Sequence, residues 1–335
     1  MLLIINIGSS SFRWAVFDNR LVVIKNGKIT GGDDTAKIFQ SVWQDLEKEK
    51  LTEKIQAVGH RVVFGPDDLS NPCLADENII KKIDKVSPAA PLHNPRQLKT
   101  IFYCYKNLKI PQIIHFDNGF FRHLPLAAQV LPIPYRYWQQ GWRKVGYHGL
   151  SHAAAAELKK YPKIISVHAG SGVSVAAISN GRPIDTTMGM TPLAGAVMMT
   201  RPGDLDPGVV LKLIEENGLN KTREILNHQS GVKGIAETSD MIEILRASDK
   251  RSLLAKKIFT NSLQKIIGSY IILLGGADAL VFSGAIVQEN NSIRRQLIAA
   301  AKKLVPAIKI KVVGGGEEII MAKETLKFLR RKKNG

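Results

Sequence analysis

The chain opens on two short apolar segments separated by small residues. Residues 2–7 (LLIINI) and 12–17 (FRWAVF) are rich in β-branched and aromatic side chains, and they flank residues 8–11 (GSSS). Apolar runs bounded by turn residues are typical of β-strands. We therefore predict two strands joined by a tight turn. A third strand over residues 21–25 is predicted to turn at Asn26-Gly27, because this dipeptide favours two-residue hairpins.

The rest of the chain alternates between helical and strand periodicity. One helix is predicted to begin at Asp206-Pro207, since Asp is a good N-cap and Pro fits the first helical turn. The other predicted helices cover residues 34–49, 95–106, 249–274, 291–304 and 317–329, and the other predicted strands cover residues 55–59, 112–116, 163–167, 173–178, 279–282 and 308–313.

The opening pattern returns from residue 163. A strand leads into His168-Ala-Gly-Ser-Gly172, a second strand follows, and Asn180-Gly181 marks another hairpin. Asn6-x-Gly8-Ser9 then aligns with His168-x-Gly170-Ser171. The chain is thus predicted to contain two copies of one α/β unit led by a β-hairpin. Both turns are rich in glycine and serine where a strand ends, so a phosphate could approach backbone N–H groups there.

A length of 335 residues suits two domains. No low-complexity linker divides the halves, and prolines at positions 125, 132 and 134 favour a boundary between Asp117 and Trp138. We assign residues 1–120 to a first domain and residues 121–317 to a second. The final helix, residues 318–335, is expected to pack back on the first domain.

Composition excludes several classes of protein. With 44% hydrophobic and 23% charged residues, the chain can bury cores. No apolar stretch approaches the roughly 20 residues of a membrane-spanning helix, and no export signal is visible. Two cysteines without CxxC spacing indicate a reduced, cytoplasmic chain. The net charge of +18 fits a nucleic-acid binder or a solvated, lysine-rich surface; because the lysines are spread evenly, we favour the surface and predict no nucleic-acid or membrane partner.

Three charged side chains stand at positions suited to chemistry. Arg61, in Gly59-His-Arg-Val-Val63, lies near a predicted strand end, where its fork can bind a carboxylate or phosphate, although a surface arginine fits the segment too. Asp117 directly follows an apolar strand, a place that suits a metal ligand or a simple turn former. Arg201 shares a loop with Asp204 and Asp206, which favours function over an internal ion pair.

Two histidines lie four residues apart in Gly146-Tyr-His-Gly-Leu-Ser-His152, a spacing that could bind zinc on a helix. Gly149 and the N-cap-like Ser151 instead place His148 before a helix and His152 at its start, and no third ligand is spaced nearby. We interpret His148 as a donor to an anion and His152 as a structural histidine.

The ordered set of motifs resembles the acetate, propionate and butyrate kinase family, the acetokinases. NIGSSSFRWAVF is similar to the family's opening NxGSSSxK, GHRVVFG to GHRVVHGG, SPAAPLHNP to APLHNP, FDNGFFRHLP to FDTAFHxTMP, and GYHGLSH to FHGTSH. The longest match is DTTMGMTPLAGAVMMTRPGDLDPG, which resembles DTSMGxTPLEGLxMGTRSGDIDP, and GGEEIIMAKET resembles the closing NEELxIAxDT. The acetate kinase branch fits best.

The resemblance implies a fold, a reaction and a set of site residues. The fold is α/β, with duplicated actin-like ATPase (ribonuclease H-like) domains and an active-site cleft between them. The reaction is transfer of the γ-phosphoryl group of ATP to acetate, with Mg²⁺ (or Mn²⁺) as cofactor, in a cytoplasmic homodimer. The implied roles are metal binding for Asn6 and Glu317, acyl contact for Arg61, catalysis for Asp117, His148 and Arg201, and nucleotide binding for Arg13, His168, Ala169, Gly170, Ser171, Gly172, Asp240, Ala285, Glu289 and Asn290.

Several positions depart from the family pattern. The family's HLGNG is HAGSG here, so Ser171 replaces an asparagine, and its GIGEN loop becomes residues 285–290 (AIVQEN). Isoleucine at position 242 replaces the arginine of the family's SxDxR segment, and Phe64 and Phe121 replace histidines. The chain is also shorter than usual members. Propionate, butyrate or pyrophosphate as substrate, and a catalytically weak binding or scaffold protein, therefore stand as alternatives.

Overall fold

The computed structural model describes residues 1–8, 11–91, 93–314 and 316–333. The chain divides into two compact units. Unit 1 comprises Met1–Arg122, His148–Ser151 and Gly315–Gly335, and unit 2 comprises His123–Tyr147 and His152–Gly314. Helix α6 (Gly149–Ala156) contributes residues to both.

Unit 1 is built on a six-stranded sheet with the order β3-β2-β1-β4-β6-β5. Strands β1, β2 and β3 are antiparallel, whereas β4 runs parallel to both β1 and β6. Its elements are β1 (Leu2–Ile7), β2 (Ser11–Phe17), β3 (Val23–Thr30), α1 (Thr35–Lys48), β4 (Ala57–Val62), β5 (Cys73–Leu74), α2 (Glu77–Val86), α3 (Asn94–Asn107), β6 (Gln112–Phe116) and α13 (Gly316–Lys333).

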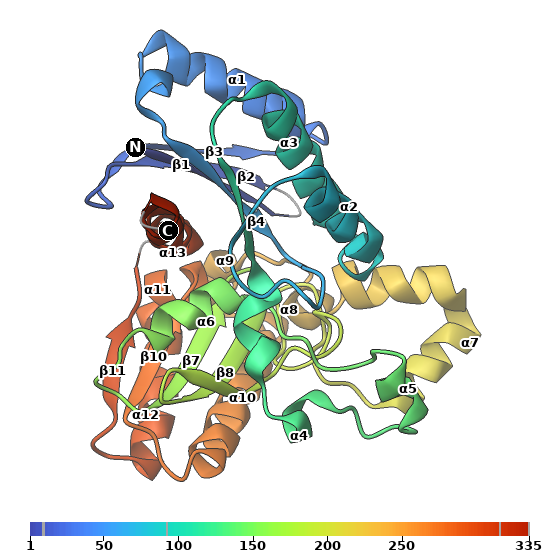
Figure 1. Cartoon of the computed structure of the whole chain (residues 1–335). Coiled ribbons are helices and arrows are strands. Elements are labelled where there is room, and N and C mark those ends of the chain that lie inside the picture. The colour runs from blue at the N-terminus through green and yellow to red at the C-terminus, as the bar shows by residue number, and fades with distance from the viewer. Residues whose placement is uncertain (9–10, 92, 315, 334–335) are drawn as a thin grey trace. The chain divides into compact units, whose positions relative to one another are not determined.

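The alternation of side chains along β1 decides what each face of this sheet contacts. Leu3, Ile5 and Ile7 pack in the core formed with α1, whereas Leu2 and Ile4 pack against Met321 and Ala322 of α13. Helices α1, α2 and α3 thus cover one face and α13 covers the other (Figure 1). Asn6 shares the α13 face with Leu2 and Ile4, and this placement positions it for the site described below.

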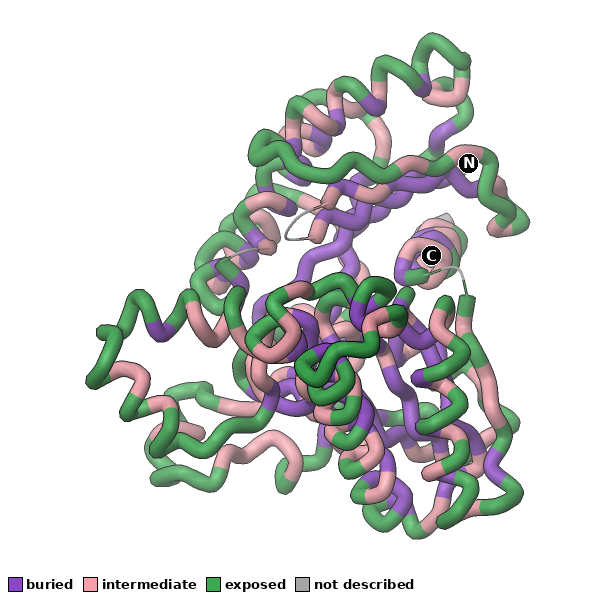
Figure 2. Tube along the Cα trace, turned by 180° about the vertical axis from the view of Figure 1, so that it is seen from behind, coloured by how far each residue is buried: buried purple, intermediate pink, exposed green. Residues whose placement is uncertain are grey.

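The predicted hairpin at Asn26-Gly27 is wrong. Both residues lie inside β3, where Asn26 pairs with Ala15 and Gly27 with Trp14. A Cβ at Gly27 would lie 2.7 Å from the Trp14 indole, so the glycine makes room for the ring of the neighbouring strand. The strand is also mostly solvent-exposed, as Figure 2 shows by its contrast with the buried central strands.

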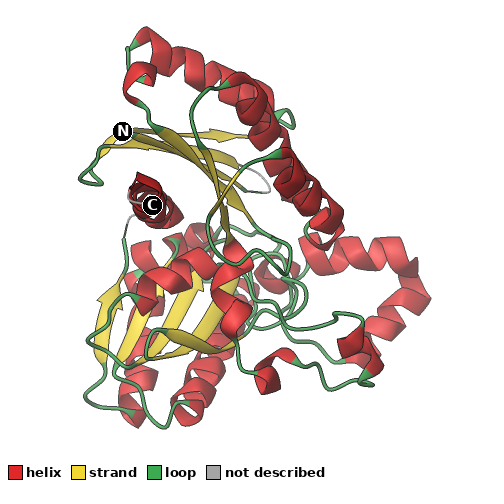
Figure 3. Ribbon diagram, in the orientation of Figure 1, coloured by secondary structure: helices red, strands yellow, loops and turns green. Residues whose placement is uncertain are grey.

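Unit 2 is built on a five-stranded sheet with the order β11-β10-β7-β8-β9. Helices pack against the sheets of both units (Figure 3). The elements of unit 2 are α4 (Leu126–Gln129), α5 (Arg136–Gln139), β7 (Lys163–Ala169), β8 (Val173–Ser179), β9 (Arg182–Thr186), α7 (Pro207–Glu224, interrupted at Gly218), α8 (Gly231–Ala236), α9 (Met241–Arg246), α10 (Lys250–Leu273), β10 (Ala279–Ser283), α11 (Ala285–Glu289), α12 (Asn291–Leu304) and β11 (Lys309–Val312).

The two sheets share one topology, which confirms the predicted α/β class and its duplication. Written from the outer hairpin strand inward, β3-β2-β1-β4-β6 matches β9-β8-β7-β10-β11. In each case three antiparallel strands are followed by two parallel ones. The predicted Asn180-Gly181 hairpin is confirmed too, because both residues have the positive φ that a tight hairpin needs.

The helices of the described residues are too short or too polar to span a membrane.

Candidate functional site

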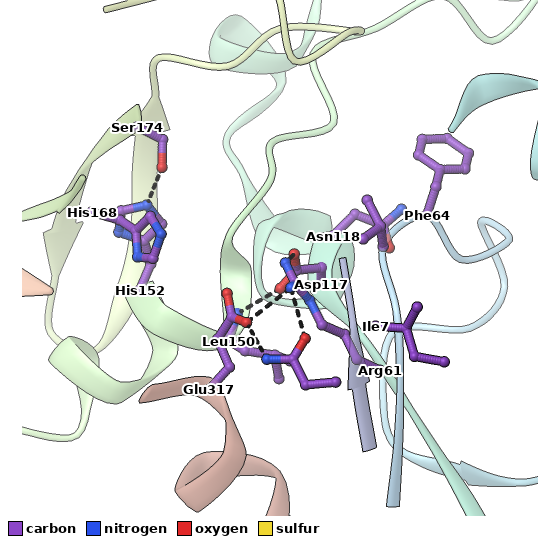
Figure 4. Close-up of polar contacts among 12 residues, drawn as sticks. Ile7, Arg61, Phe64, Asp117, Asn118, Leu150, His152, His168, Ser174 and Glu317 are labelled. Atoms are coloured by element: carbon purple, nitrogen blue, oxygen red, sulfur yellow. Dashed lines mark hydrogen bonds and ion pairs between the residues drawn. The ribbon is translucent and has the colours of Figure 1, made fainter. Parts of the chain in front are cut away.

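In unit 1, four polar side chains converge on the α13 face of the sheet. Asn6 is the penultimate residue of β1, Arg61 is the penultimate residue of β4, and Asp117 follows β6. Glu317 comes from the first turn of α13. All four are buried, and Figure 4 shows Asp117 and Glu317 directed at Arg61. The structure thus brings together two predicted metal ligands, the predicted acyl-binding arginine and the predicted catalytic aspartate.

Arg61 is the centre of this cluster. One guanidinium nitrogen, Nη1, donates to Asn6 Oδ1 at 3.0 Å and lies 2.9 Å from Glu317 Oε2, while Nη2 donates to Asp117 Oδ2 at 2.5 Å. Burial alone would lower the pKa of Arg61, but the neighbouring carboxylates outweigh burial and raise it. Arg61 is therefore a fixed cation whose planar fork is already oriented.

Asp117 begins a short 3-10 turn, and helix α6 packs tightly against it. Burial and the neighbouring Glu317 raise the pKa of Asp117, whereas the contact with Arg61 opposes the rise. The backbone N–H of Leu150 donates to Asp117 Oδ1 at 3.4 Å. A Cβ at Gly149 would lie 1.8 Å from the Asp117 carbonyl oxygen, so only glycine permits this close approach.

A second glutamate and a second arginine extend the cluster. The Asn6 amide nitrogen donates to Glu317 Oε2 at 2.8 Å and to Glu318 Oε1 at 2.7 Å. Arg13 lies 3.7 Å from Glu317 and 3.5 Å from Glu318. Asp117, Glu317 and Glu318 thus face the guanidinium groups of Arg13 and Arg61.

This donor set fits Mg²⁺. The ion prefers oxygen ligands, keeps several waters and needs only one or two carboxylates. Asn6 Oδ1 and the Glu317 carboxylate lie side by side on Arg61, and both are oxygen donors of the kind that the ion prefers. Within the described residues no three acidic, histidine or cysteine side chains form a metal cluster. The remaining ligands of the ion would therefore be water molecules.

His148 precedes α6, as predicted, and its backbone is unusual. Its φ is 57°, a left-handed conformation that is costly for a residue with a side chain. Strain of this kind concentrates at functional sites, which is consistent with a role for His148. His152, by contrast, is buried between Ser166 and Ser174 at 2.9 and 2.8 Å, and this confirms its interpretation as a structural histidine.

In unit 2, His168 stands where Asn6 stands in unit 1. It pairs in register with Ser283 of β10, and its Nδ1 lies 3.2 Å from the Ser283 hydroxyl (Figure 4 shows His168). The following turn, which holds Ala169, Gly170, Ser171 and Gly172, is closed by a bond from the Gly170 N–H to the Gly172 carbonyl at 2.9 Å. The exposed Ser171 hydroxyl remains available to a phosphate.

The turn that follows β1 is closed by the same kind of backbone hydrogen bond. The Gly8 N–H donates to the Ser11 carbonyl at 2.8 Å, and Ser9 and Ser10 lie outside the described residues. In both turns the first glycine amide is therefore used within the hairpin. A phosphate at either turn has to be bound by other donors.

Arg201 differs from Arg61 in its surroundings. Its Nη1 contacts only the Pro192 carbonyl at 3.4 Å and the Met198 sulfur at 4.0 Å, and it makes no ion pair with any described residue. Burial lowers the pKa of Arg201, and Tyr147 partly offsets this. The alternative of an internal ion pair is wrong, because Asp204 accepts the Gly195 N–H and Asp206 caps α7. Arg201 presents a largely uncompensated positive charge, as an anion site requires.

The predicted nucleotide-binding residues near the end of unit 2 lie at the start of α9 and along α11. Asp240 caps α9 by accepting the Ile242 N–H at 2.8 Å. Ala285 and Glu289 are exposed residues of α11, so the segment predicted as a loop is a short helix. The Asn290 side chain donates to the Ile286 carbonyl at 3.0 Å.

Sequence reasoning missed Glu318, although it stands next to Glu317 in the closing motif. The available signal was the acidic pair itself at the start of a helix, where negative charge is stabilised. A Cβ at Gly316 would meet the Glu318 carboxylate at 2.5 Å, so the preceding glycine permits the position of this side chain.

Comparison with known proteins agrees with this geometry. The model of the Acetokinase family matches residues 20–325. An acetate kinase from Thermoanaerobacter pseudethanolicus is 32% identical over 401 residues, which cover 98% of this chain and 99% of that relative. Since this chain has 335 residues, at least 66 positions of the alignment have no counterpart in it.

Two solved structures are similar over almost the whole chain. A propionate kinase from Francisella tularensis matches with a TM-score of 0.89 at 29% identity, covering 96% of this chain and 98% of the other. An acetate kinase from Porphyromonas gingivalis matches with a TM-score of 0.86 at 29% identity, covering 98% and 99%. The strand-end cluster, the duplicated sheets and these matches agree: the chain belongs to the acetokinase family.

Proposed function

We propose that the protein is an acetate kinase, which transfers the γ-phosphoryl group of ATP to acetate by direct in-line attack and reversibly forms acetyl phosphate and ADP. The observation that carries the proposal is the buried cluster of Asn6, Arg61, Asp117 and Glu317, within a chain of this family.

The chemical difficulty is charge rather than proton transfer. A carboxylate acceptor with a pKa of about 4–5 is ionised at pH 7 and needs no general base. Bringing it toward the phosphates, however, costs about 4 kcal/mol for each pair of like charges at about 4 Å and an effective dielectric of about 20. Fixed positive groups are therefore what the site has to supply.

The residues of unit 1 would bind the acceptor and hold the cation. Asn6 and Glu317 would hold Mg²⁺, and Arg61 would contact the acetate carboxylate. When bound, Mg²⁺ supplies charge neutralisation for the phosphate oxygens. Asp117 orients Arg61 and lacks the role of a base, because the acceptor carries no proton to remove.

A second set of residues, from unit 2 together with His148 and Arg13 of unit 1, would act on the phosphates. Arg201, which forms no ion pair with any described residue, would stabilise the negative charge that spreads over the transferring oxygens, and His148 would donate to the same group. Ser171 and His168 would bind phosphate oxygens, while Arg13, Ala169, Gly170, Gly172, Asp240, Ala285, Glu289 and Asn290 would lie on the nucleotide side.

A second candidate has a specific observation in its favour. The side of unit 2 expected to hold the nucleoside differs from the family pattern, since residues 285–289 form a helix and Ile242 is an exposed apolar residue where the family has arginine. These differences favour testing pyrophosphate as donor. Propionate and butyrate remain candidate acceptors, because a propionate kinase is among the similar structures. We also propose a cytoplasmic homodimer.

The test is a hydroxylamine trap of acyl phosphate. Acetate, propionate and butyrate are each combined with ATP or pyrophosphate, with Mg²⁺ and without it. We expect most product from acetate, ATP and Mg²⁺. Product from another pair only would replace the assigned substrates, and no product from any pair would favour a binding or scaffold protein.

A further inference from the structure

The turn that follows Arg61 is held by side chains rather than by the sheet. Strand β4 pairs with β1 as far as His60 and with β6 as far as Val62. Residues 63–65 follow the last paired residues of β4. Their backbone groups lie next to the end of the strand from which Arg61 projects. Buried backbone groups need partners, so other donors and acceptors have to replace the ladder.

Three buried amides provide these partners. Asn94 accepts the Phe64 N–H at 3.1 Å and donates to the Phe64 carbonyl at 2.8 Å. Asn118 does the same for Gly65, accepting its N–H at 3.0 Å and donating to its carbonyl at 3.1 Å. Each asparagine thus offers one donor and one acceptor to a single residue, as an adjacent strand would.

Gln97 joins two strands of the site. Its Oε1 accepts the Val63 N–H at 3.0 Å, and its Nε2 donates to the carbonyl of Ile7 at 2.8 Å. Ile7 follows the predicted metal ligand Asn6, and Val63 lies two residues after Arg61. Asn118 in turn directly follows Asp117. Figure 4 shows Ile7, Phe64 and Asn118 around the cluster.

We propose that Asn94, Gln97 and Asn118 form an amide clamp that positions Arg61 relative to Asn6 and Asp117. The clamp connects the ends of β1, β4 and β6, and its three amides are at most 1% exposed. It assigns a role to the asparagines of the HNP and FDN segments, whose side chains bond to the backbone of Phe64 and Gly65. All three are positioning residues, and the inference rests on the proposed function because its kinetic test uses that reaction.

The decisive variant is Gln97→Glu. The carboxylate keeps the acceptor for Val63 but loses the donor to the Ile7 carbonyl, so the amide link between the ends of β1 and β4, beyond their paired residues, is lost. A displacement of about 1 Å can cost about 100-fold in rate, and we expect kcat/KM to fall about 10- to 100-fold. Most of the change should appear in KM for acetate, because Arg61 is the group displaced.

Gln112→Glu is the matched control. Gln112 is also a buried amide of unit 1, and it bonds to His60 and to the Ile110 carbonyl at the opposite end of β6. This variant should lower the melting temperature comparably and leave KM unchanged. Equal changes in KM for the two variants would show a general effect of lost stability and would overturn the clamp.

A double-mutant cycle tests whether Gln97 acts through Arg61. Residues that act as a unit are non-additive, so Gln97→Glu should cost less than about threefold when Arg61 is already alanine. The same fold loss in both backgrounds would contradict the proposal. If Gln97→Glu does not fold, Asn118→Asp replaces it, since that change keeps the acceptor for Gly65 and removes the donor.

A measurement independent of activity separates the clamp from the proposed function. The Arg61 Nη–H groups should exchange slowly with solvent in side-chain NMR spectra of the wild type and of Gln112→Glu, and rapidly in Gln97→Glu. A wild type that forms no acyl phosphate would refute the kinase assignment alone, whereas unchanged exchange in Gln97→Glu would refute the clamp alone.

Discussion

The two units place different side chains at one equivalent position of a shared scaffold. In unit 1, Asn6 of β1 bonds to Arg61 of β4, and in unit 2, His168 of β7 lies beside Ser283 of β10 in the corresponding register. The first pair is surrounded by carboxylates, whereas the second leads into a turn of small residues. The same position of the scaffold therefore occurs twice, and it holds a cluster of ionised side chains in unit 1 and a histidine–serine pair in unit 2.

Arg61, which is buried, and Arg201, which is partly buried, extend the comparison. Arg61 is paired with two carboxylates, so its charge is balanced before any substrate binds. Arg201 hydrogen-bonds to a carbonyl and a thioether, and it forms no ion pair with any described residue. We expect Arg61 to contribute to stability as well as to binding, and Arg201 to contribute to catalysis at the expense of stability.

The largest expected effect is on the rate of the Arg201→Ala variant. Removing a preorganised cation from the transferring phosphoryl group should lower kcat about 10³-fold, or about 4 kcal/mol, in the hydroxylamine assay. Its unfolding free energy should stay within about 1 kcal/mol of the wild type, because no ion pair is lost. Arg182→Ala, at an exposed arginine of the same unit, is the control and should change neither quantity.

The next effect is on the stability of Arg61→Ala. This change leaves Asp117 and Glu317 buried without their shared cation, and breaking such a pair typically costs about 3–5 kcal/mol. Urea denaturation measures it against Arg251→Ala, which breaks an exposed pair with Glu237 and should cost less than about 1 kcal/mol. Similar losses of unfolding free energy in Arg61→Ala and Arg201→Ala would show that the two arginines do not differ in their contribution to stability.

Acid should destabilise the fold through three buried histidines. Burial lowers the pKa of His60 to about 4 and those of His115 and His152 to about 3, against an ordinary value of about 6.5. Between about pH 4 and pH 6 the unfolded chain thus binds protons that the folded chain does not. The stabilisation is complete above about pH 6.5 and is lost as the pH falls, by about 1.4 kcal/mol per pH unit for each ring.

Replacing one of the three histidines tests how many more protons the unfolded chain binds than the folded chain. His152→Asn should make the dependence of unfolding free energy on pH shallower by about 1.4 kcal/mol per unit between about pH 4 and pH 6. An unchanged slope in His152→Asn would mean that this ring is protonated in the folded state.

The smallest expected effect is on KM for ATP, when Ser171 in the turn of residues 169–172 is replaced. Ser171→Asn restores the residue of the family pattern and adds an amide donor at an exposed position. We expect KM for ATP to fall about threefold and kcat to stay the same, measured by initial rates at saturating acetate. A rise in KM would indicate that this turn does not contact the phosphates.

Much of the fold could be predicted because local pattern and tertiary structure agree. β1, β6 and α10 lie within a residue of their predicted bounds, since each is a continuous apolar run or a long periodic segment with clear ends. The local sequence could not show that Asn26-Gly27 forms no hairpin. Glycine is needed at position 27 because the Trp14 side chain of the neighbouring strand occupies the space of a Cβ. No helix was predicted over Glu77–Val86, although it is amphipathic.

The site was predictable only in part, because some of its contacts depend on tertiary structure rather than on local pattern. Asn6, Arg61 and Asp117 stand at strand ends, where parallel topology gathers polar side chains, so their positions were readable. The contacts of Glu318 and the amide bonds of Gln97 depend on segments far apart in sequence, and pattern alone does not reveal them. The function of Asp240 as a helix cap could be read from its place before α9.

Gly149 shows how an absent side chain can constrain a protein. Because a single methyl group there would meet the Asp117 carbonyl at 1.8 Å, any other residue has to push α6 or the aspartate aside. Laboratory evolution of this chain will therefore find position 149 closed to all nineteen alternatives, even in libraries selected only for a new acyl substrate. Efforts to enlarge the acceptor range should start elsewhere and leave this contact intact.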